Sequence, residues 1–419
     1  MMLPAQALIA GLLITAAQID PTPVDPQRAE IYFREAKELC SRDNGRLWGV
    51  SLCGPMVIAD ARTRTIATSE PAPPGERPGS LGFMNAPMEW GGKRWTAYVW
   101  TFIPADDRRA RDELLIHELF HRIQPQIGLF PETASTGHLD TLEGRYLLQL
   151  EWRALAQALR TSGNQRKRAL SDALAFRNAR HSMFTDAAAN ERPNEVREGL
   201  AQYTATVVTA SSTAESVRSA LDQLSAAEKQ ESFVDAFAYT SGVAYGVLLD
   251  AVSPGWRRKL KETSDLSEVL MTAARIQPEK DISSAAARYR GIELRAAETE
   301  RDRKLTARIA ELRQRFVDGP VLTLPGSGSG TFDIRGAVAL PGSGTVYFST
   351  YRMAGDWGRM EASNGVLWST DRVTRTLAGP FRVEGNTLIG DAWTVTVASG
   401  WTVRSGPRPS DSQIVRDGR

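Results

Sequence analysis

The chain has 419 residues, of which 42% are hydrophobic and 24% are charged, and its formal net charge is +2. This length predicts about two or three domains, and the ordinary hydrophobic content predicts folded cores. The near-neutral charge does not indicate a nucleic-acid-binding protein, so we expect no nucleic-acid partner.

The first 17 residues, 1–17, resemble a secretory signal peptide. The apolar run from Ala7 to Ala17 is too short to span a bilayer comfortably, and it ends in small residues that suit a signal peptidase. No basic residue precedes the run, so a disordered or interfacial N-terminal stretch is the alternative. No other apolar run is long enough to cross a membrane, and we expect a periplasmic or secreted protein without a membrane span.

The two cysteines, Cys40 and Cys53, lie close together in the sequence. An even number, a short spacing and an export signal predict one disulfide in an oxidising compartment. Two unpaired thiols in a reducing compartment are the alternative. No second cluster of Cys and His accompanies the pair, so we do not expect a cysteine zinc site.

The predicted elements fall into three successive regions. The first region begins with a helix from Asp25-Pro26 to about Cys40 and ends with the strongest strand signal of the chain, at 95–104. Between them lie a loop over 70–80 and short apolar stretches typical of a small sheet, at 47–52, 56–59 and 65–68.

The second region, from Asp106 to about Phe316, is mostly helical. We expect helices at about 107–124, 140–162, 191–209, 213–229, 231–252 and 282–316. Near Asp318 the composition shifts to Gly, Ser, Thr and Val, and turn signals recur. The third region is therefore predicted to be a small all-β domain over 318–405, followed by a disordered tail over 406–419.

Two of the four histidines lie four residues apart in the motif HExxH, formed by His117, Glu118 and His121. On a helix of 3.6 residues per turn, positions four apart are separated by about 40° around the axis, so both imidazoles project from one face and can bind one metal ion. Glu118, at the edge of that face, can reach a metal-activated water without being a ligand. The alternative is that HExxH occurs here by chance. A chance occurrence is rarer in a chain with so few histidines.

Downstream, Glu198 and Gly199 begin the sequence Glu-Gly-Leu-Ala-Gln-Tyr. Together with HExxH, this sequence resembles the gluzincin group of metallopeptidases, in which a Glu-Gly-x-Ala-x-Tyr helix supplies the third zinc ligand. The resemblance covers about residues 95–250, and it implies Zn²⁺ held by His117, His121 and Glu198. Gly199 would let two helices approach closely beside the metal. Gln202 stands where many relatives carry an acid that orients a ligand histidine.

Other residues compete for the third position. The class of zinc sites with a third histidine six residues beyond the second would need Gly at position 124 and His at position 127. The chain has Gln124 and Ile127 there, so this class is excluded. Glu143 is the main rival of Glu198, with a salt bridge to a neighbouring arginine as its structural alternative. The remaining candidates are Glu195, Asp140 and His138.

The resemblance also implies roles around the metal. Tyr239, three residues before Gly242, would donate a hydrogen bond to the oxyanion; Tyr245 is the runner-up, and an ordinary buried aromatic is the alternative. In this family the strand before the metal helix, here Trp95–Ile103, edges the cleft and pairs with an extended peptide. Glu118 would be the general base for a zinc-activated water.

The expected fold class is α+β. It consists of a zincin-like catalytic domain over 18–317, with a small sheet, many helices and a helical insertion at about 140–190 that folds away from the cleft, and of the small all-β C-terminal domain. The expected function is that of a secreted or periplasmic zinc metallopeptidase acting on a peptide or protein substrate. One alternative keeps the zinc site and changes the substrate to a non-peptide amide.

A second alternative is a non-catalytic binding protein that acts through the C-terminal β domain. Five aromatic residues there would line a ligand surface: Tyr347, Phe348, Tyr351, Trp357 and Trp368. Such residues more often form the core of a small sandwich.

Overall fold

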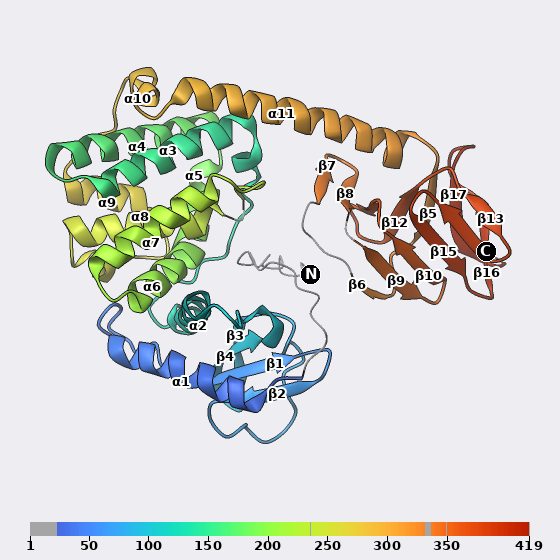
Figure 1. Ribbon diagram of the computed structural model, residues 1–419, viewed down its shortest axis with the longest axis horizontal. Coiled ribbons are helices and arrows are strands. Elements are labelled where there is room, and N and C mark those ends of the chain that lie inside the picture. The colour runs from blue at the N-terminus through green and yellow to red at the C-terminus, as the bar shows by residue number, and fades with distance from the viewer. Residues whose placement is uncertain (1–22, 235, 332–336, 349, 419) are drawn as a thin grey trace. The chain divides into compact units, whose positions relative to one another are not determined.

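The computed structural model describes residues 23–418 except 235, 332–336 and 349, so the predicted signal peptide lies outside the described residues. The chain divides into two compact units, with the boundary between Glu298 and Thr299. The α+β class is confirmed, because helices dominate the first unit and strands dominate the second (Figure 1). Within the described part of the chain, no helix is both long and apolar enough to cross a membrane.

A small four-stranded sheet lies in the first unit, in the order β2-β1-β4-β3. The strands are β1 (Met56–Asp60), β2 (Thr65–Thr68), β3 (Ala86–Trp90) and β4 (Lys93–Val99). β1 pairs in parallel with β4 and antiparallel with β2, and β3 pairs antiparallel with β4. The predicted strand at 47–52 is instead a series of turns.

The expectation that Trp95–Ile103 edges the cleft is wrong. β4 is hydrogen-bonded on both sides, and the chain turns into a short 3₁₀ helix, Trp100–Phe102, after it. The edge strand beside β4 is β3, which the sequence pattern did not indicate because it contains a proline. Pro87 lacks an N–H group, and an edge strand is where a sheet tolerates it.

Helices make up most of the first unit (Figure 1). They are α1 (Pro26–Asp43), α2 (Arg108–Ile123), α3 (Leu142–Arg160), α4 (Gly163–Met183), α5 (Ala187–Asn194), α6 (Leu200–Thr209), α7 (Thr213–Ala227), α8 (Phe237–Val252), α9 (Leu266–Ala274) and α10 (Ile282–Arg288). The last helix, α11 (Gly291–Arg313), crosses the boundary into the second unit. The helix predicted over 191–209 contains a π-helical turn, Glu195–Gly199, between α5 and α6. The helix predicted over 282–316 is broken at Arg290, whose backbone is left-handed (φ 59°).

Helix α2 carries the HExxH motif and is set firmly in the core. Asp107 caps it by accepting a hydrogen bond from the Ala110 N–H, which satisfies one of the free N–H groups of the first turn. The helix packs against β3 and β4 on one side and against α6 on another. Leu115, Leu119 and Phe120 are fully buried, so the motif lies inside the unit.

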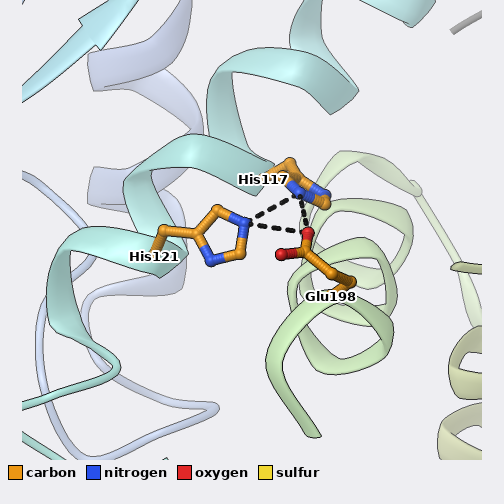
Figure 2. Close-up of side chains that lie close together, drawn as sticks. All are labelled: His117, His121 and Glu198. Atoms are coloured by element: carbon orange, nitrogen blue, oxygen red, sulfur yellow. Dashed lines mark hydrogen bonds and ion pairs between the residues drawn. The ribbon is translucent and has the colours of Figure 1, made fainter. Parts of the chain in front are cut away.

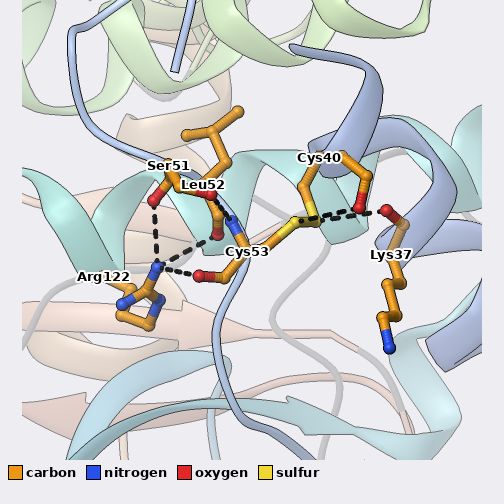
Figure 3. The surroundings of a disulfide bond; sticks show 7 residues. Lys37, Cys40, Ser51, Leu52, Cys53 and Arg122 are labelled. Atoms are coloured by element: carbon orange, nitrogen blue, oxygen red, sulfur yellow. Dashed lines mark hydrogen bonds between the residues drawn. A yellow bond between two sulfur atoms is a disulfide. The ribbon is translucent and has the colours of Figure 1, made fainter. Parts of the chain in front are cut away.

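The predicted disulfide between Cys40 and Cys53 is confirmed, with a Cα–Cα distance of 5.2 Å (Figure 3). It ties the end of α1 to the loop before β1. Arg122, next to His121 on α2, donates hydrogen bonds to the carbonyl oxygens of Leu52 and Cys53, at 3.1 and 2.7 Å. The loop is thereby fixed both to α1 and to the motif helix.

The second unit contains two β-sheets whose inner faces share one core. The seven-stranded sheet has the order β16 (Trp401–Ser405), β17 (Ser412–Arg416), β5 (Val321–Pro325), β12 (Thr374–Ala378), β11 (Val366–Ser369), β8 (Gly344–Tyr347) and β7 (Val338–Leu340). The six-stranded sheet has the order β13 (Arg382–Glu384), β14 (Thr387–Gly390), β15 (Trp393–Val397), β10 (Gly358–Ala362), β9 (Tyr351–Gly355) and β6 (Ser329–Thr331). Leu322, Leu377 and Val395 are fully buried between them.

Two features of this unit differ from expectation. The predicted disordered tail over 406–419 contains strand β17, which pairs with β16 and β5 and buries Ile414 in the shared core. The unit also begins before 318, because Leu312 and Phe316, at the end of α11 and just after it, pack against the outer face of the seven-stranded sheet. The composition shift near 318 marks the end of this helical segment.

Candidate metal centre

Three side chains converge inside the first unit. His117 and His121 lie on α2, and Glu198 lies on the π-helical turn between α5 and α6 (Figure 2). The two Nε2 atoms are 3.0 Å apart, and Oε2 of Glu198 lies 3.5 Å from Nε2 of His117 and 3.3 Å from Nε2 of His121. Among the residues that the structure describes, this is the only group of three or more His, Cys, Asp or Glu side chains spaced to hold a metal ion.

The spacing of these donor atoms fits a tetrahedral zinc ion. Zinc binds imidazole nitrogen and carboxylate oxygen at about 2.0–2.2 Å, so two tetrahedral ligands lie about 3.3 Å apart. The separations of 3.0, 3.3 and 3.5 Å bracket that value. Two imidazoles and one carboxylate are also a donor set of catalytic zinc sites, in which the fourth position stays open.

Gln202 fixes the orientation of His117. Its Oε1 lies 3.2 Å from Nδ1 of His117, and its Nε2 faces Oε2 of Glu113 at 3.5 Å. Because the amide nitrogen points to a carboxylate, Oε1 is the acceptor and the proton of His117 sits on Nδ1. The lone pair of Nε2 is left to face the other two donors. Gln202 thus occupies the place expected for an orienting acid and makes the corresponding hydrogen bond.

Gln124 does the same for His121. Its Nε2 donates to the carbonyl oxygens of Val196 and Arg197, at 3.2 and 2.9 Å, so its Oε1 must be the acceptor from Nδ1 of His121 at 2.6 Å. One buried amide therefore joins the second histidine to the backbone of the turn that carries Glu198. The sequence pattern gave this residue no role, because the partners of its amide come from a distant segment.

The charges at the centre favour a cation. Burial lowers the pKa of His121, but the adjacent Glu198 carboxylate, together with Glu118 and Gln124, outweighs burial and raises this pKa to about 9. Burial raises the pKa of Glu198, yet His121 and His117 hold it well below its usual range. The carboxylate is therefore charged, and a metal ion at the two Nε2 atoms would replace the proton that His121 otherwise keeps.

Glu118 lies beside these three residues and is buried. Burial raises its pKa, and the neighbouring His121 and His117 oppose this only in part. A hydrogen bond from the Asn85 side chain reaches Glu118, while Oδ1 of Asn85 accepts the Val99 N–H at 2.8 Å. Asn85 immediately precedes edge strand β3, and the sequence pattern did not single it out.

The close helix approach predicted at Gly199 is present. A Cβ atom added to Gly199 would lie 2.7 Å from the carbonyl oxygen of Ala238 and 3.0 Å from the Cα atom of Gly242. Real Cβ atoms rarely come so near to backbone. The π-helical turn and α8 therefore cross at a pair of glycines, which brings α8 up to the metal centre.

Tyr239 on α8 lies directly against the centre. Its ring stacks on that of His117, with centroids 5.5 Å apart and planes inclined by 11°, and its hydroxyl donates to Oε2 of Glu198 at 3.0 Å. Tyr245, the runner-up for the oxyanion donor, is buried elsewhere and donates to Oε1 of Glu151 at 2.7 Å. Of the two tyrosines, only Tyr239 contacts the ligand set.

The rivals of Glu198 lie outside the centre. Glu143 forms a salt bridge with Arg295 at 2.9 Å. A salt bridge is the predicted alternative to a ligand role, but the arginine is distant in the sequence and not a neighbour. Asp140 accepts hydrogen bonds from Ser232 and Phe233. The other two rivals are engaged by buried charges: Glu195 by Arg177 and His138 by Glu191.

The five aromatic residues singled out in the C-terminal unit have three different surroundings, and Phe348 packs partly buried beside Leu312 and Phe316. Tyr351 and Trp357 belong to the core, with exposed fractions of 2% and 0%. Tyr347 and Trp368 line a hollow of about 320 Å³, together with Arg372. Tyr351 and Trp357 therefore have the core role that such residues more often have, and the alternative of a shared ligand surface does not hold for these two.

Comparisons of the chain with models of known protein families, with curated proteins and with solved structures found no match. The functional argument for this protein accordingly depends on the geometry and chemistry of the centre itself.

Proposed function

We propose that this protein is a zinc-dependent metallopeptidase with a gluzincin-type centre in a zincin-like domain. The observation that carries the proposal is the convergence of His117, His121 and Glu198 at tetrahedral spacing, with Glu118 buried beside them. The glutamine contacts at both Nδ1 atoms add support, because outer partners of this kind are typical of metal-ligating histidines.

Zinc, when bound, supplies a Lewis acid that acidifies water and polarises a carbonyl group. Glu118 accepts the proton of the attacking water and passes it to the leaving nitrogen, a role that suits a carboxylate whose pKa burial raises. Asn85 orients this carboxylate. Tyr239, with its hydroxyl beside Glu198, donates a hydrogen bond to the developing oxyanion.

The proposed substrate is a peptide or protein in extended conformation. Edge strand β3 packs against α2 and, among the described residues, pairs only with β4, so its other side has backbone groups for an added strand. We propose that the protein works in the periplasm or outside the cell. The Cys40–Cys53 disulfide supports this location, because disulfides persist in oxidising compartments.

The test is peptide hydrolysis by Glu118→Gln. This change removes the proton acceptor but keeps the shape of the side chain, so we expect the metal to stay bound and turnover to fall on the order of 10²–10⁴-fold. Asp112→Asn, which removes a carboxylate from the same helix, is the matched control and should leave turnover unchanged. Retained turnover in Glu118→Gln would refute Glu118 as the base. Turnover of small amides but not of peptides would favour the non-peptide amidase.

A further inference from the structure

A cluster of buried charges lies behind the metal centre. Arg177 and Arg180 on α4 are fully buried, and so is Glu151 on α3. Glu191 and Glu195 are 1% exposed. Burying so many charges is unfavourable unless each has close partners in fixed geometry. The cluster meets that condition, so its members hold one another in well-defined positions.

Arg177 connects this cluster to the ligand turn. Its Nη1 and Nη2 atoms form a fork on the carboxylate of Glu195, at 2.9 and 2.5 Å, while its Nε donates to Glu151 at 2.9 Å. The guanidinium also lies over the ring of Tyr245, with 4.6 Å between Cζ and the ring centroid. The planar group is thus restrained on several sides, and it fixes the Glu195 side chain.

Glu195 and the ligand Glu198 belong to the same π-helical turn, Glu195–Gly199. Glu195 faces the buried cluster, and Glu198 faces the two histidines. π-helical turns are rare and frequent at functional sites, and relaxation to an α-helix would rotate one residue relative to the other. The Arg177 fork holds the turn at its first residue.

We infer that Arg177 is a positioning residue for the metal ligand Glu198, acting through Glu195. The helical segment at 140–190, which we expect to fold away from the cleft, takes part in this positioning. Helix α4 belongs to that segment, and its arginine supports the ligand turn from behind. The inference rests on the proposed metal centre. It does not depend on the substrate.

Arg180 provides a matched control. It is as buried as Arg177 and pairs with Glu151 at 2.7 Å and with Glu191 at 2.8 Å, both of which lie outside the π-helical turn. A lysine at either position keeps the charge but loses the planar fork. The two lysine variants therefore disturb the same cluster, and only one of them releases Glu195.

The experiment is a titration of the full chain with cobalt(II), followed by the visible absorption of the bound ion. We expect Arg177→Lys to weaken cobalt binding by about 10–100-fold and to change the spectrum. This is the usual effect when a residue that orients a metal ligand is lost. We expect Arg180→Lys to keep the affinity and the spectrum of the parent, even if both variants unfold more easily.

A double variant separates position from stability. Arg177→Met with Glu195→Met replaces the ion pair by apolar groups, which often restores stability. If Arg177 positions Glu198, cobalt affinity stays reduced in this variant although the fold is stable. Recovery of the parent's affinity, or equal effects of the two lysine variants, would overturn the inference alone. A parent that binds cobalt without hydrolysing peptides would refute the proposed function alone, and a parent that binds no cobalt would overturn both.

Discussion

Replacement of Gln124 by methionine removes one buried amide that serves two parts of the centre. Gln124 is fully buried, accepts from Nδ1 of His121 and donates to the carbonyl groups of Val196 and Arg197. Methionine has a similar length but offers no comparable donor or acceptor. His121 then loses the partner that keeps its proton on Nδ1, and the ligand turn loses its attachment to α2.

The expected effect of Gln124→Met is about 10–100-fold weaker zinc binding, the usual result when an outer partner of a metal-ligating histidine is lost. This corresponds to about 1.4–2.8 kcal/mol of binding free energy. The free energy of unfolding should also fall, by about 1–3 kcal/mol, because buried polar groups remain without partners. Zinc affinity is measured by competition with a chromophoric chelator, and stability by urea unfolding in the absence of metal.

Gln149→Met is the matched control for this experiment. Gln149 is 4% exposed and donates to the Arg145 carbonyl oxygen and to Glu298, at 3.2 and 2.6 Å, away from the centre. Its replacement should lower stability by a similar amount and leave zinc affinity unchanged. Zinc binding by Gln124→Met as tight as in the parent, or an equal loss in both variants, would refute the role assigned to Gln124.

Two further predictions concern the ligand turn and the histidine beside it. Gly199→Ala places a Cβ atom 2.7 Å from a backbone oxygen of α8. The free energy of unfolding should therefore fall by about 1–3 kcal/mol, and zinc affinity should fall with it. In the control Gly255→Ala, the added Cβ meets nothing within 4 Å, so neither quantity should change. Urea unfolding and metal competition measure both effects, and equal behaviour of the two variants would contradict the packing argument. The second prediction follows from the pKa of His121, which burial lowers but Glu198, together with Glu118 and Gln124, raises from 6.5 to about 9. Protonated His121 stabilises the metal-free fold fully below pH 6.5, and this contribution, up to about 3 kcal/mol, is lost as the pH rises through 9. Unfolding free energies measured with a chelator across this range should show the decline, and no decline would show that Glu198 does not stabilise the protonated histidine.

The parts of the centre that depend on local spacing could be predicted from the sequence. His117 and His121 share a helix face because of their four-residue separation, and this requires no knowledge of the tertiary fold. Glu198 and Gly199 were found through a second short motif. The structure brings Glu198 to the histidines and Gly199 to α8, as the motif implied.

The supporting residues could not be predicted, because each acts through a partner far away in the sequence. Gln124 binds the backbone of residues 196 and 197, and Arg177 binds Glu195 from another helix. The separate bounds of helix α4 could not be predicted within the helical insertion expected at about 140–190, since charged residues on its inner face interrupt the apolar periodicity that marks a helix. Edge strand β3 escaped notice for a similar reason, because Pro87 argues against a strand except at the edge of a sheet.

The most direct test of the central claim is the zinc content of the purified full chain, measured by elemental analysis for the parent and three variants. His121→Ala and Glu198→Ala remove proposed ligands, and Glu143→Ala removes the rival carboxylate that instead pairs with Arg295. We predict about one zinc ion per chain in the parent and in Glu143→Ala, and none in the other two variants. Zinc retained by Glu198→Ala, or a parent that binds no zinc, would contradict the account.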